Sequence, residues 1–234
     1  MKDTLILKAQ EQKRAREEIN LKHMENGVSF VDYERTYIDA DVAIGKGTVI
    51  YPNCTIENGT TIGEDCVLLP NSRISAAVIG NSVRIESSVL DKCKVGNGTT
   101  VGPFAYIRPD SVIGEKCRIG DFVEIKNSHI DDMTKVSHLT YVGDSDLGKD
   151  INLGCGVVFV NYDGKTKKRS TVGDKAFIGC NTNLVAPVNV GKEAYIAAGA
   201  TVTEDVPEGA LYIARSMGTI KEGWVNKRKA DGKL

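Results

Sequence analysis

The amino-acid sequence predicts a mainly β protein, a parallel β-helix assembled from six-residue units. The chain has 24 glycines among 234 residues and only 6% aromatic residues, which suits a structure with many tight corners and an aliphatic interior. The stronger observation is an unbroken six-residue period of aliphatic residues at Ile38, Ile44, Ile50, Ile56, Ile62, Leu68 and Ile74. Each unit predicts a short strand and a corner, and three units make one triangular coil of about 18 residues.

The period continues over most of the chain with small shifts. Five-residue steps intrude around Ile79, Ile85, Leu90 and Val95, and the strict period then returns at Val101, Ile107, Ile113, Ile119 and Ile125. Smaller slips lead through Ile130, Val136, Val142, Leu147, Leu153 and Phe159, and a 13-residue step precedes Val172, Ile178, Leu184, Val190, Ile196 and Val202. We therefore predict a β-helix domain over residues 31–206.

The two ends of the chain do not share this period. Residues 1–30 are highly charged with few apolar positions, so they predict an exposed helical arm or linker. Residues 207–234 form a tail that ends in a basic cluster, Lys227, Arg228, Lys229 and Lys233. The composition of this cluster fits either a solvated tail or an arm that faces a phosphate.

Charge and cysteine content exclude several classes of protein. Lys and Arg total 30 against 31 Asp and Glu, so no basic field predicts a nucleic-acid partner. No two of the six cysteines form a CxxC pair, and Cys54, Cys66, Cys93 and Cys117 occupy small-residue positions where we expect core packing rather than disulfides. Without a long apolar run, we expect no membrane insertion and a cytoplasmic location.

The coil geometry brings charged residues together. Arg108 and Lys126 each follow an inward aliphatic residue and lie 18 residues apart, so they should project side by side from one face. Two adjacent cations favour an anionic ligand such as a phosphate, although the spacing alone also fits a solvated charge pair.

A second column should run along another edge. Counting two residues past the aliphatic position gives His138, Cys155, Cys180 and Ala198, over about 14 Å at about 4.8 Å per coil. The 13-residue step holds Asn161-Tyr162-Asp163-Gly164 and a basic run, which predicts a projecting polar loop, a usual place for function in a solenoid.

Histidines are few in this chain. We expect surface positions for His23 and His129, and either a structural or a functional role for His138. The three are poorly distributed for a three-histidine metal centre, so no metal is expected.

Six motifs occur in an order that resembles one enzyme family. They are Arg108-Pro109, Val123-Glu124-Ile125-Lys126, Ser137-His138-Leu139-Thr140-Tyr141, Asn161-Tyr162-Asp163-Gly164, Leu184-Val185-Ala186-Pro187 and Lys221-Glu222-Gly223-Trp224. Together they resemble the acetyltransferase half of the bifunctional N-acetylglucosamine-1-phosphate uridylyltransferase/glucosamine-1-phosphate acetyltransferases, over roughly residues 20–225. The resemblance implies the left-handed β-helix of the hexapeptide acyltransferases and a homotrimer with sites between subunits.

The resemblance also implies a reaction and a set of residues. The reaction is acetyl transfer from acetyl-CoA to the 2-amino group of glucosamine 1-phosphate, a step toward UDP-N-acetylglucosamine and cell-wall peptidoglycan. His138 matches the general base. The sugar-phosphate pocket matches Arg108, Lys126, Tyr141 and Asn152. The acetyl-CoA contacts match Cys155, Asn161, Tyr162, Cys180, Ala198 and Arg215, the last from the tail.

Two departures from the family pattern stand out. Cys180 replaces a common serine and Cys155 a common alanine, which weakens a hydroxyl contact at position 180. The family's Gly-rich nucleotide loop is absent from this sequence, so uridylyl transfer is not expected. Two other hypotheses remain at this stage: an acyltransferase that acts on another amino sugar, and a non-catalytic trimerising β-helix.

Overall fold

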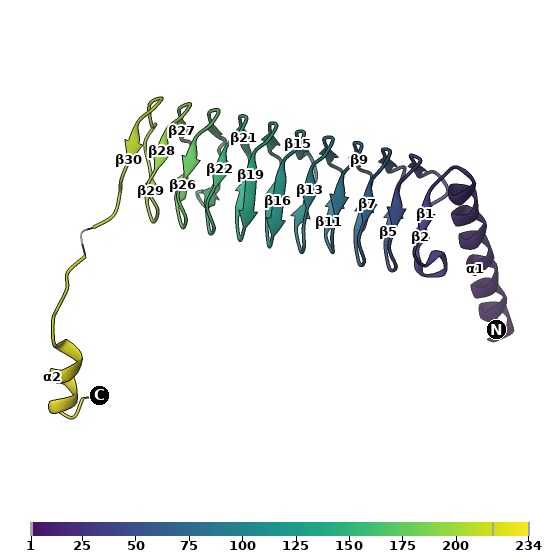
Figure 1. Ribbon diagram of the computed structural model, residues 1–234, viewed down its shortest axis with the longest axis horizontal. Coiled ribbons are helices and arrows are strands. Elements are labelled where there is room, and N and C mark those ends of the chain that lie inside the picture. The colour runs from purple at the N-terminus through teal and green to yellow at the C-terminus, as the bar shows by residue number, and fades with distance from the viewer. Residues whose placement is uncertain (1, 217, 234) are drawn as a thin grey trace.

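The computed structural model describes residues 2–216 and 218–233. Within this range the chain winds into a parallel β-helix, an elongated stack of coils with a helix at its N-terminal end (Figure 1). Most strands pair in parallel with the strand three strands further along the chain, so that successive coils contribute one strand to each of three sheets, and at the C-terminal end β28 pairs with β30. The β-helix predicted from the six-residue period is confirmed.

The strands are two to four residues long, and we name the three sheets A, B and C. Sheet A contains β1 (Ser29–Phe30), β4 (Val49–Ile50), β7 (Val67–Leu68), β10 (Arg84–Ile85), β13 (Thr100–Val101), β16 (Arg118–Asp121), β19 (Lys135–His138), β22 (Asn152–Leu153), β25 (Phe177–Ile178), β28 (Tyr195–Ile196) and β30 (Leu211–Tyr212). Sheet B contains β2 (Tyr37–Ile38), β5 (Thr55–Glu57), β8 (Arg73–Ser75), β11 (Val89–Asp91), β14 (Tyr106–Ile107), β17 (Glu124–Lys126), β20 (Tyr141–Gly143), β23 (Val158–Val160), β26 (Asn183–Val185) and β29 (Thr201–Val202). Sheet C contains β3 (Ala43–Ile44), β6 (Thr61–Ile62), β9 (Val78–Ile79), β12 (Lys94–Val95), β15 (Val112–Ile113), β18 (His129–Ile130), β21 (Ser145–Leu147), β24 (Ser170–Val172) and β27 (Asn189–Val190).

The aliphatic period forms the core because in-register pairing stacks its members. Ile56 pairs with Ile38 on one side and Ile74 on the other, and all three side chains are buried. Such stacking removes nearly all of each aliphatic side chain from water, which stabilises the fold by about 1.5–3 kcal/mol for each residue. The same row-by-row burial runs along all three sheets.

Four cysteines fill small gaps in this core, as predicted. Cys54, Cys66, Cys93 and Cys117 are buried, and all six cysteines of the chain are free thiols. Burial raises the pKa of the Cys54 and Cys117 thiols to about 11 and that of Cys93 to about 12, because a thiolate is poorly solvated there. These thiols therefore stay protonated and pack as small apolar groups.

The corners explain the glycine and asparagine content of the repeat. Asn53 and Asn71 adopt the left-handed conformation, with φ of 63° and 64°, which asparagine tolerates better than most residues. Gly63 is required for another reason, because a Cβ atom there would lie 2.6 Å from the backbone of Gly80 in the next coil. Close stacking of coils thus restricts this position to glycine.

The N-terminal helix α1 (Lys2–Glu25) packs its last turns on the first coil. The Asn20 side chain donates hydrogen bonds to the carbonyl oxygens of Tyr33 and Thr36, 2.7 and 3.0 Å away, and the 3-10 helix η1 (Tyr33–Arg35) lies beside it. His23 is buried in this contact, and burial lowers the pKa of its imidazole. The surface position predicted for His23 is therefore wrong, because the helix covers the open end of the solenoid.

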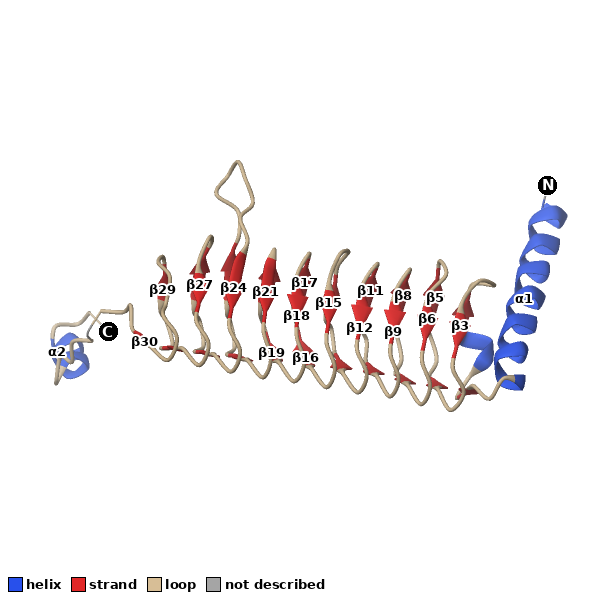
Figure 2. Cartoon of the chain, turned by 90° about the horizontal axis from the view of Figure 1, so that it is seen from above, coloured by secondary structure: helices blue, strands red, loops and turns tan. Residues whose placement is uncertain are grey.

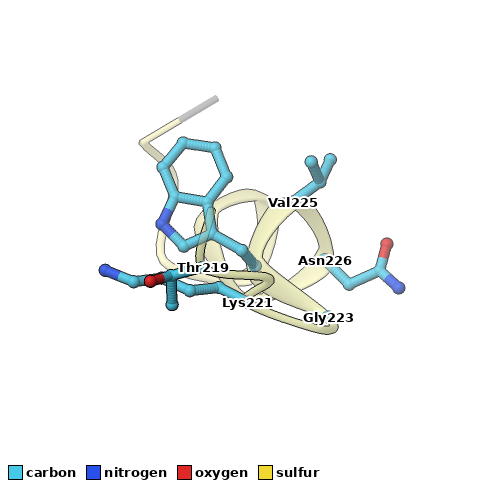
Figure 3. A pocket seen from close by; sticks show the side chains of 6 residues that line it. Thr219, Lys221, Gly223, Val225 and Asn226 are labelled. Carbon is cyan, nitrogen blue, oxygen red and sulfur yellow. The ribbon is translucent and has the colours of Figure 1, made fainter. Parts of the chain in front are cut away.

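The C-terminal tail leaves the last coil after β30 and includes a short helix, α2 (Trp224–Ala230) (Figure 1). Within the tail a hollow of about 640 Å³ is lined by exposed residues of α2 and the turn before it, among them Lys221 and Trp224 (Figure 3). The guanidinium of Arg228 lies 5.1 Å from the Trp224 ring centroid. None of the residues predicted for the sugar-phosphate or acetyl-CoA contacts lines this hollow.

The 13-residue step forms a loop that projects from the solenoid between β23 and β24, seen in Figure 2 as the one long excursion beside β24. An antiparallel bridge between Tyr162 and Lys167 closes it. The predicted projecting loop is thus confirmed. Among the described residues, the structure contains no helix both long and apolar enough to cross a membrane.

Candidate functional site

His138 lies in a column of residues at the corner where sheet A ends and sheet B begins. Register pairing aligns Val136, Leu153, Ile178 and Ile196 across β19, β22, β25 and β28. The residues two positions later, His138, Cys155, Cys180 and Ala198, therefore stand one above another, as the spacing predicted. Backbone hydrogen bonds from Asn181 to Cys155 and from Gly199 to Cys180, both 2.8 Å, hold consecutive coils together there.

A carboxylate stands directly beneath His138 in the same column. Asp121 of β16 pairs in register with His138, and its Oδ1 lies 2.5 Å from the imidazole Nδ1. This contact with His138 is the main reason why the pKa of Asp121 is lowered. Among the described residues, the other ring nitrogen, Nε2, makes no hydrogen bond, and half of the side chain is exposed. The imidazole is thus held from one side and open on the other.

The tail reaches the far end of this column. Arg215 Nη1 donates a hydrogen bond to the carbonyl oxygen of Ala198, 2.5 Å away. Cys155 is half-buried, and Cys180 and Ala198 are exposed. The column is therefore lined by small side chains and is bounded by His138 at one end and by a guanidinium at the other.

The predicted cation pair lies on sheet B, and each member contacts a carboxylate. Ile107 and Ile125 pair in register, so Arg108 and Lys126, which follow them, are neighbours. Arg108 Nη1 donates to Glu124 Oε1 at 2.7 Å, whereas Lys126 Nζ lies 3.4 Å from Asp144 Oδ2. The two cations are consequently held in place by carboxylates, and their side chains remain 38% exposed for Arg108 and 19% exposed for Lys126.

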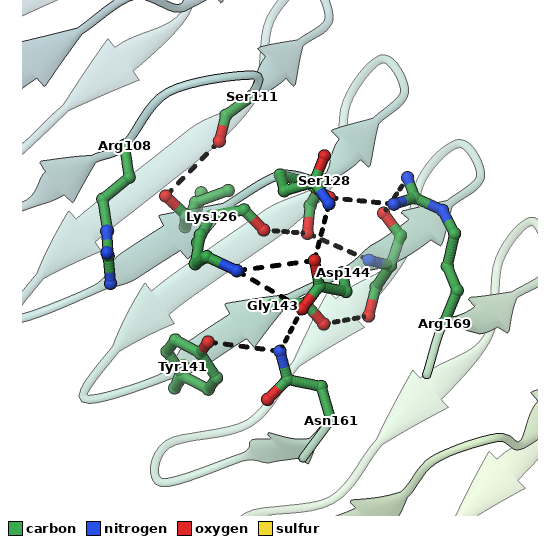
Figure 4. Close-up of polar contacts among 12 residues, drawn as sticks. Arg108, Ser111, Lys126, Ser128, Tyr141, Gly143, Asp144, Asn161 and Arg169 are labelled. Carbon is green, nitrogen blue, oxygen red and sulfur yellow. Dashed lines mark hydrogen bonds and ion pairs between the residues drawn. The ribbon is translucent and has the colours of Figure 1, made fainter. Parts of the chain in front are cut away.

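Asp144 is the centre of a polar network beneath Lys126 (Figure 4). Its buried carboxylate accepts hydrogen bonds from Asn127 Nδ2 at 2.6 Å and Asn161 Nδ2 at 2.5 Å, in addition to the Lys126 contact. Burial by itself raises the pKa of Asp144, but these hydrogen bonds and the Lys126 charge outweigh it, so the net pKa is lowered. Asp144 therefore stays ionised and joins the cation face to the projecting loop.

The loop contributes its own groups to this network. Asn161 Nδ2 also donates to Tyr141 Oη at 3.3 Å (Figure 4). The exposed Tyr162 donates its hydroxyl hydrogen bond to the carbonyl oxygen of Gly164, 2.7 Å away within the loop. Asn161 and Tyr141 thus meet, although 20 residues separate them, while Tyr162 stands further out.

Two basic residues of the loop have different places: Lys167 joins the cation face, and Arg169 holds the base of the loop. The pKa of Lys167 is lowered, first by its contact with the Lys126 ammonium and also by the charge of Arg108. Arg169 anchors the base of the loop, because it pairs with both carboxylate oxygens of Asp146 and donates to the carbonyl oxygen of Asn127 at 2.9 Å. Three cations therefore crowd together at Lys126, which is the arrangement that an anion would relieve.

Within one chain, Asn152 lies apart from the other residues predicted for the sugar-phosphate pocket, Arg108, Lys126 and Tyr141. It is half-buried on the outer side of sheet A, between Lys135 and Phe177, whereas Tyr141 lies on sheet B. The predicted sugar-phosphate residues are thus divided between two sheets. No group of three or more His, Cys, Asp or Glu side chains among the described residues is arranged to hold a metal ion.

The sequence reasoning missed several residues of the site. Asp121 precedes His138 by 17 positions rather than 18, so a count based on the full coil passes over it. Asn127 and Asp144 lie in consecutive coils, each at the corner between sheets B and C. Their side chains meet there because both residues adopt positive φ. Lys167 was visible in the sequence only as one member of a basic run.

The sequence of this chain is similar to a known family of transferases and to several curated proteins. A family model described as bacterial transferase hexapeptide (six repeats) matches residues 35–69 and 92–127. The bifunctional protein GlmU of Clostridium botulinum (strain Kyoto / Type A2) is 60% identical over 213 residues, covering 91% of this chain and 47% of that protein. GlmU of Clostridium kluyveri (strain ATCC 8527) is 54% identical over 220 residues, covering 94% and 48%. The chain thus spans about half the length of the curated relatives it matches.

A solved structure is similar in fold. The UDP-N-acetylglucosamine acyltransferase from Arabidopsis superposes with a TM-score of 0.52 at 17% identity, covering 89% of this chain and 73% of that chain. At this identity the likeness shows the fold alone.

Proposed function

We propose that the chain, which corresponds over 91% of its length to the acetyltransferase half of the GlmU proteins, transfers acetyl from acetyl-CoA to the 2-amino group of glucosamine 1-phosphate. The product, N-acetylglucosamine 1-phosphate, serves UDP-N-acetylglucosamine synthesis. The single observation that carries the proposal is the position of His138, open to solvent through Nε2, at the head of a small-residue column, with the cation face on the adjoining sheet B.

His138 acts as the general base. An ammonium group cannot attack a thioester, so the acceptor nitrogen must lose a proton on the way to the amide. A neutral imidazole can accept that proton near neutral pH, and its exposed edge leaves room for the amine. The thiol of coenzyme A is then the leaving group, and the acetyl carbon remains bonded to the sugar nitrogen.

The cation face binds the sugar phosphate. Arg108 and Lys126 are neighbours, and Lys167 adds a third cation that the other two repel in the absence of an anion. A phosphate dianion relieves this repulsion and accepts charge-assisted hydrogen bonds. The Tyr141 hydroxyl, which contacts Asn161, is available to a sugar hydroxyl on the same face.

Acetyl-CoA lies along the column from His138 to Ala198. The coils are spaced about 4.8 Å apart, so three steps give about 14 Å for an extended pantetheine arm. Cys155, Cys180 and Ala198 leave space for it, and Arg215 stands where a cofactor phosphate could bind. Asn161 and Tyr162 provide further contacts from the loop. The tail, residues 207–234, thereby contributes to the cofactor site of a β-helix domain at residues 31–206, with residues 1–30 as an arm.

We further propose a cytoplasmic homotrimer with its sites between subunits. Phe104, Phe122 and Leu139 form an exposed apolar ridge along the corner beside His138, and the two phenylalanine rings stack at a centroid distance of 5.5 Å. An exposed apolar ridge is typical of a surface that a second subunit covers. Such packing would also let Asn152, on sheet A, complete a site made by Tyr141 and Lys126 of another copy.

The test is thiol release from acetyl-CoA, measured with glucosamine 1-phosphate as acceptor. We expect release that depends on this sugar and that falls by about 10²–10⁴-fold in His138→Ala, because the base is lost. His129→Ala is the matched control, since His129 is also half exposed but lies on sheet C, where it pairs with Asp131, and should retain turnover.

A panel of acceptors separates the alternatives. N-acetylglucosamine 1-phosphate, which has no free amine, should give no release. Faster turnover with another amino sugar would show that this sugar, and not glucosamine 1-phosphate, is the preferred acceptor. Absence of thiol release with every amine would favour a non-catalytic trimerising β-helix. Full activity of a correctly assembled His138→Ala protein would contradict the assignment of the base.

A further inference from the structure

The geometry points to Asp121 as a positioning residue, one that holds His138 in the Nδ1-protonated tautomer and aims Nε2 at the acceptor amine. This inference deepens the proposed function and rests on it for the reaction in which the imidazole takes part. The tautomer itself is a property of the folded protein, so it can be tested without any turnover.

The first step of the argument is the distance. Asp121 Oδ1 and His138 Nδ1 lie 2.5 Å apart, within hydrogen-bond distance, and a hydrogen bond to an ionised carboxylate is stronger than one between neutral groups. The two residues pair in register across β16 and β19, both four-residue strands. Because both residues lie on paired backbone, the sheet fixes the separation of their Cα atoms and keeps the two side chains within reach of one another.

The second step is the charge of Asp121. The contact with His138 lowers the pKa of this carboxyl, and the positive charge of Arg118, on the same strand, acts in the same direction. Asp121 is consequently a carboxylate near neutral pH and can only accept a hydrogen bond. Nδ1 must therefore carry the proton, and Nε2 keeps the lone pair that a general base requires.

The third step concerns the other groups that face the imidazole. Lys135 lies on the same strand as His138, and Cys155 follows it in the next coil of the column. In the preceding coil, the position in line with Asp121 belongs to Pro103, which carries no charge. Among the described residues Asp121 is thus the acidic group in contact with the ring, and it stabilises the imidazolium that forms when the proton is taken up.

The kinetic experiment uses the 234-residue chain in its native assembly with Asp121→Asn, Asp121→Ala and the matched control Asp131→Asn. Asp131 contacts the other exposed histidine, His129, at 3.2 Å, so the control removes a similar pair outside the site. We expect kcat to fall by about 10-fold in Asp121→Asn, which keeps an acceptor oxygen, and by about 100-fold in Asp121→Ala, less than the loss of the base itself. The KM values for acetyl-CoA and for glucosamine 1-phosphate should stay within about twofold of those of the unsubstituted protein, since we place Asp121 behind the imidazole and away from both substrates.

The pH profile provides a readout that a purely structural role would not move. Removal of the carboxylate disfavours the protonated imidazole, so the acidic limb of kcat/KM should move to lower pH in both Asp121 variants and stay in place in Asp131→Asn. Unchanged kcat with an unchanged acidic limb in a folded Asp121→Ala protein would overturn the inference.

Nitrogen NMR of protein labelled in its three histidines tests the tautomer directly. The His138 signals, assigned from the His138→Ala spectrum, should show a protonated Nδ1 and an unprotonated Nε2 at neutral to mildly alkaline pH, and a mixture of tautomers in Asp121→Ala. A dominant Nε2-protonated form in the unsubstituted protein would overturn the inference. If the tautomer is as expected but no acceptor supports turnover, the proposed function fails while the role of Asp121 in orienting the ring stands.

Discussion

The coils before Ser75 and the coils from Arg118 to Val172 are built from the same six-residue unit but bury different groups. In the first region the interior holds aliphatic residues with cysteine and threonine, such as Cys54 and Thr60, and its ion pairs lie on the surface. In the second region a carboxylate, Asp144, and an amide, Asn161, are buried beneath Lys126. The buried polar groups thus lie where the period slips after Ile125, whereas Arg108 projects from a strictly periodic segment.

Elementary energetics explains why the two regions differ. An ionised carboxylate removed from water is strongly destabilising unless charges and hydrogen-bond donors replace the solvent. A regular coil offers its interior only backbone groups, aliphatic side chains and small neutral side chains such as Cys54 and Thr60. Around Asp144, the preceding coil offers Lys126 and Asn127, and the projecting loop offers Asn161. Arg169 pairs with Asp146 at the base of the loop. The long insertion therefore adds a third group, Asn161, to the two from the preceding coil that compensate the buried charge.

The largest effect on stability should come from the regular core. Ile56→Ala removes a fully buried side chain stacked between Ile38 and Ile74, and we expect a loss of about 2–5 kcal/mol in the free energy of unfolding. Chemical denaturation at fixed protein concentration measures it. Val78→Ala, in which half of the original side chain is exposed, is the control and should change the value by less than about 0.5 kcal/mol. Similar losses in both variants would mean that the stacked aliphatic rows are not the stabilising core.

A smaller effect should come from the site region. Asp144→Asn keeps the size of the side chain but removes the charge that Lys126 and the two asparagines contact, and we expect a loss of about 1–3 kcal/mol at neutral pH. Asp150→Asn is the matched control, because Asp150 is exposed and also adopts positive φ. It should leave the free energy of unfolding nearly unchanged.

The pH dependence of the same pair sharpens the comparison. The folded-state pKa of Asp144 is lowered, so its contribution to stability is present above the unfolded value of about 3.9 and is lost as the pH falls through the lower folded value. Between pH 6 and pH 3 the free energy of unfolding should therefore decline more steeply in the unsubstituted protein than in Asp144→Asn. Parallel curves would show that the buried carboxylate does not contribute through its charge.

The smallest effect should come from a surface ion pair of the regular region. Lys46 and Glu64 are 3.9 Å apart with side chains 73% and 51% exposed, so water and salt screen their attraction. Glu64→Gln should change the free energy of unfolding by less than about 1 kcal/mol, measured at low and high salt. A larger, salt-sensitive loss would remove the distinction that we draw between surface pairs and the buried pair at Asp144.

Much of the architecture could be predicted from spacing, because a parallel register turns a fixed count along the chain into a contact. The stacking of Ile38, Ile56 and Ile74 and the adjacency of Arg108 and Lys126 both follow from 18-residue steps. The column headed by His138 follows as well once the long insertion is assigned to one corner. The roles of these residues in binding and catalysis remain predictions that the experiments above test.

Other parts of the site could not be predicted in this way. The Asp121 contact depends on a 17-residue coil, and the Asp144 network depends on side-chain directions at corners with left-handed backbone. His23 was misjudged because the burial of a residue on a charged helix depends on what the helix packs against, here the open end of the first coil.

The sequence by itself determined the repeat, its inward aliphatic rows and the faces on which the cations and His138 stand, because periodicity depends only on residue order and a regular backbone. Only the tertiary structure decided which carboxylate meets each cation and each histidine, since those contacts join different coils at corners where the period slips. The unbroken rows therefore specify the scaffold, whereas the Asp121–His138 and Asp144–Lys126 contacts specify the chemistry that the scaffold can support.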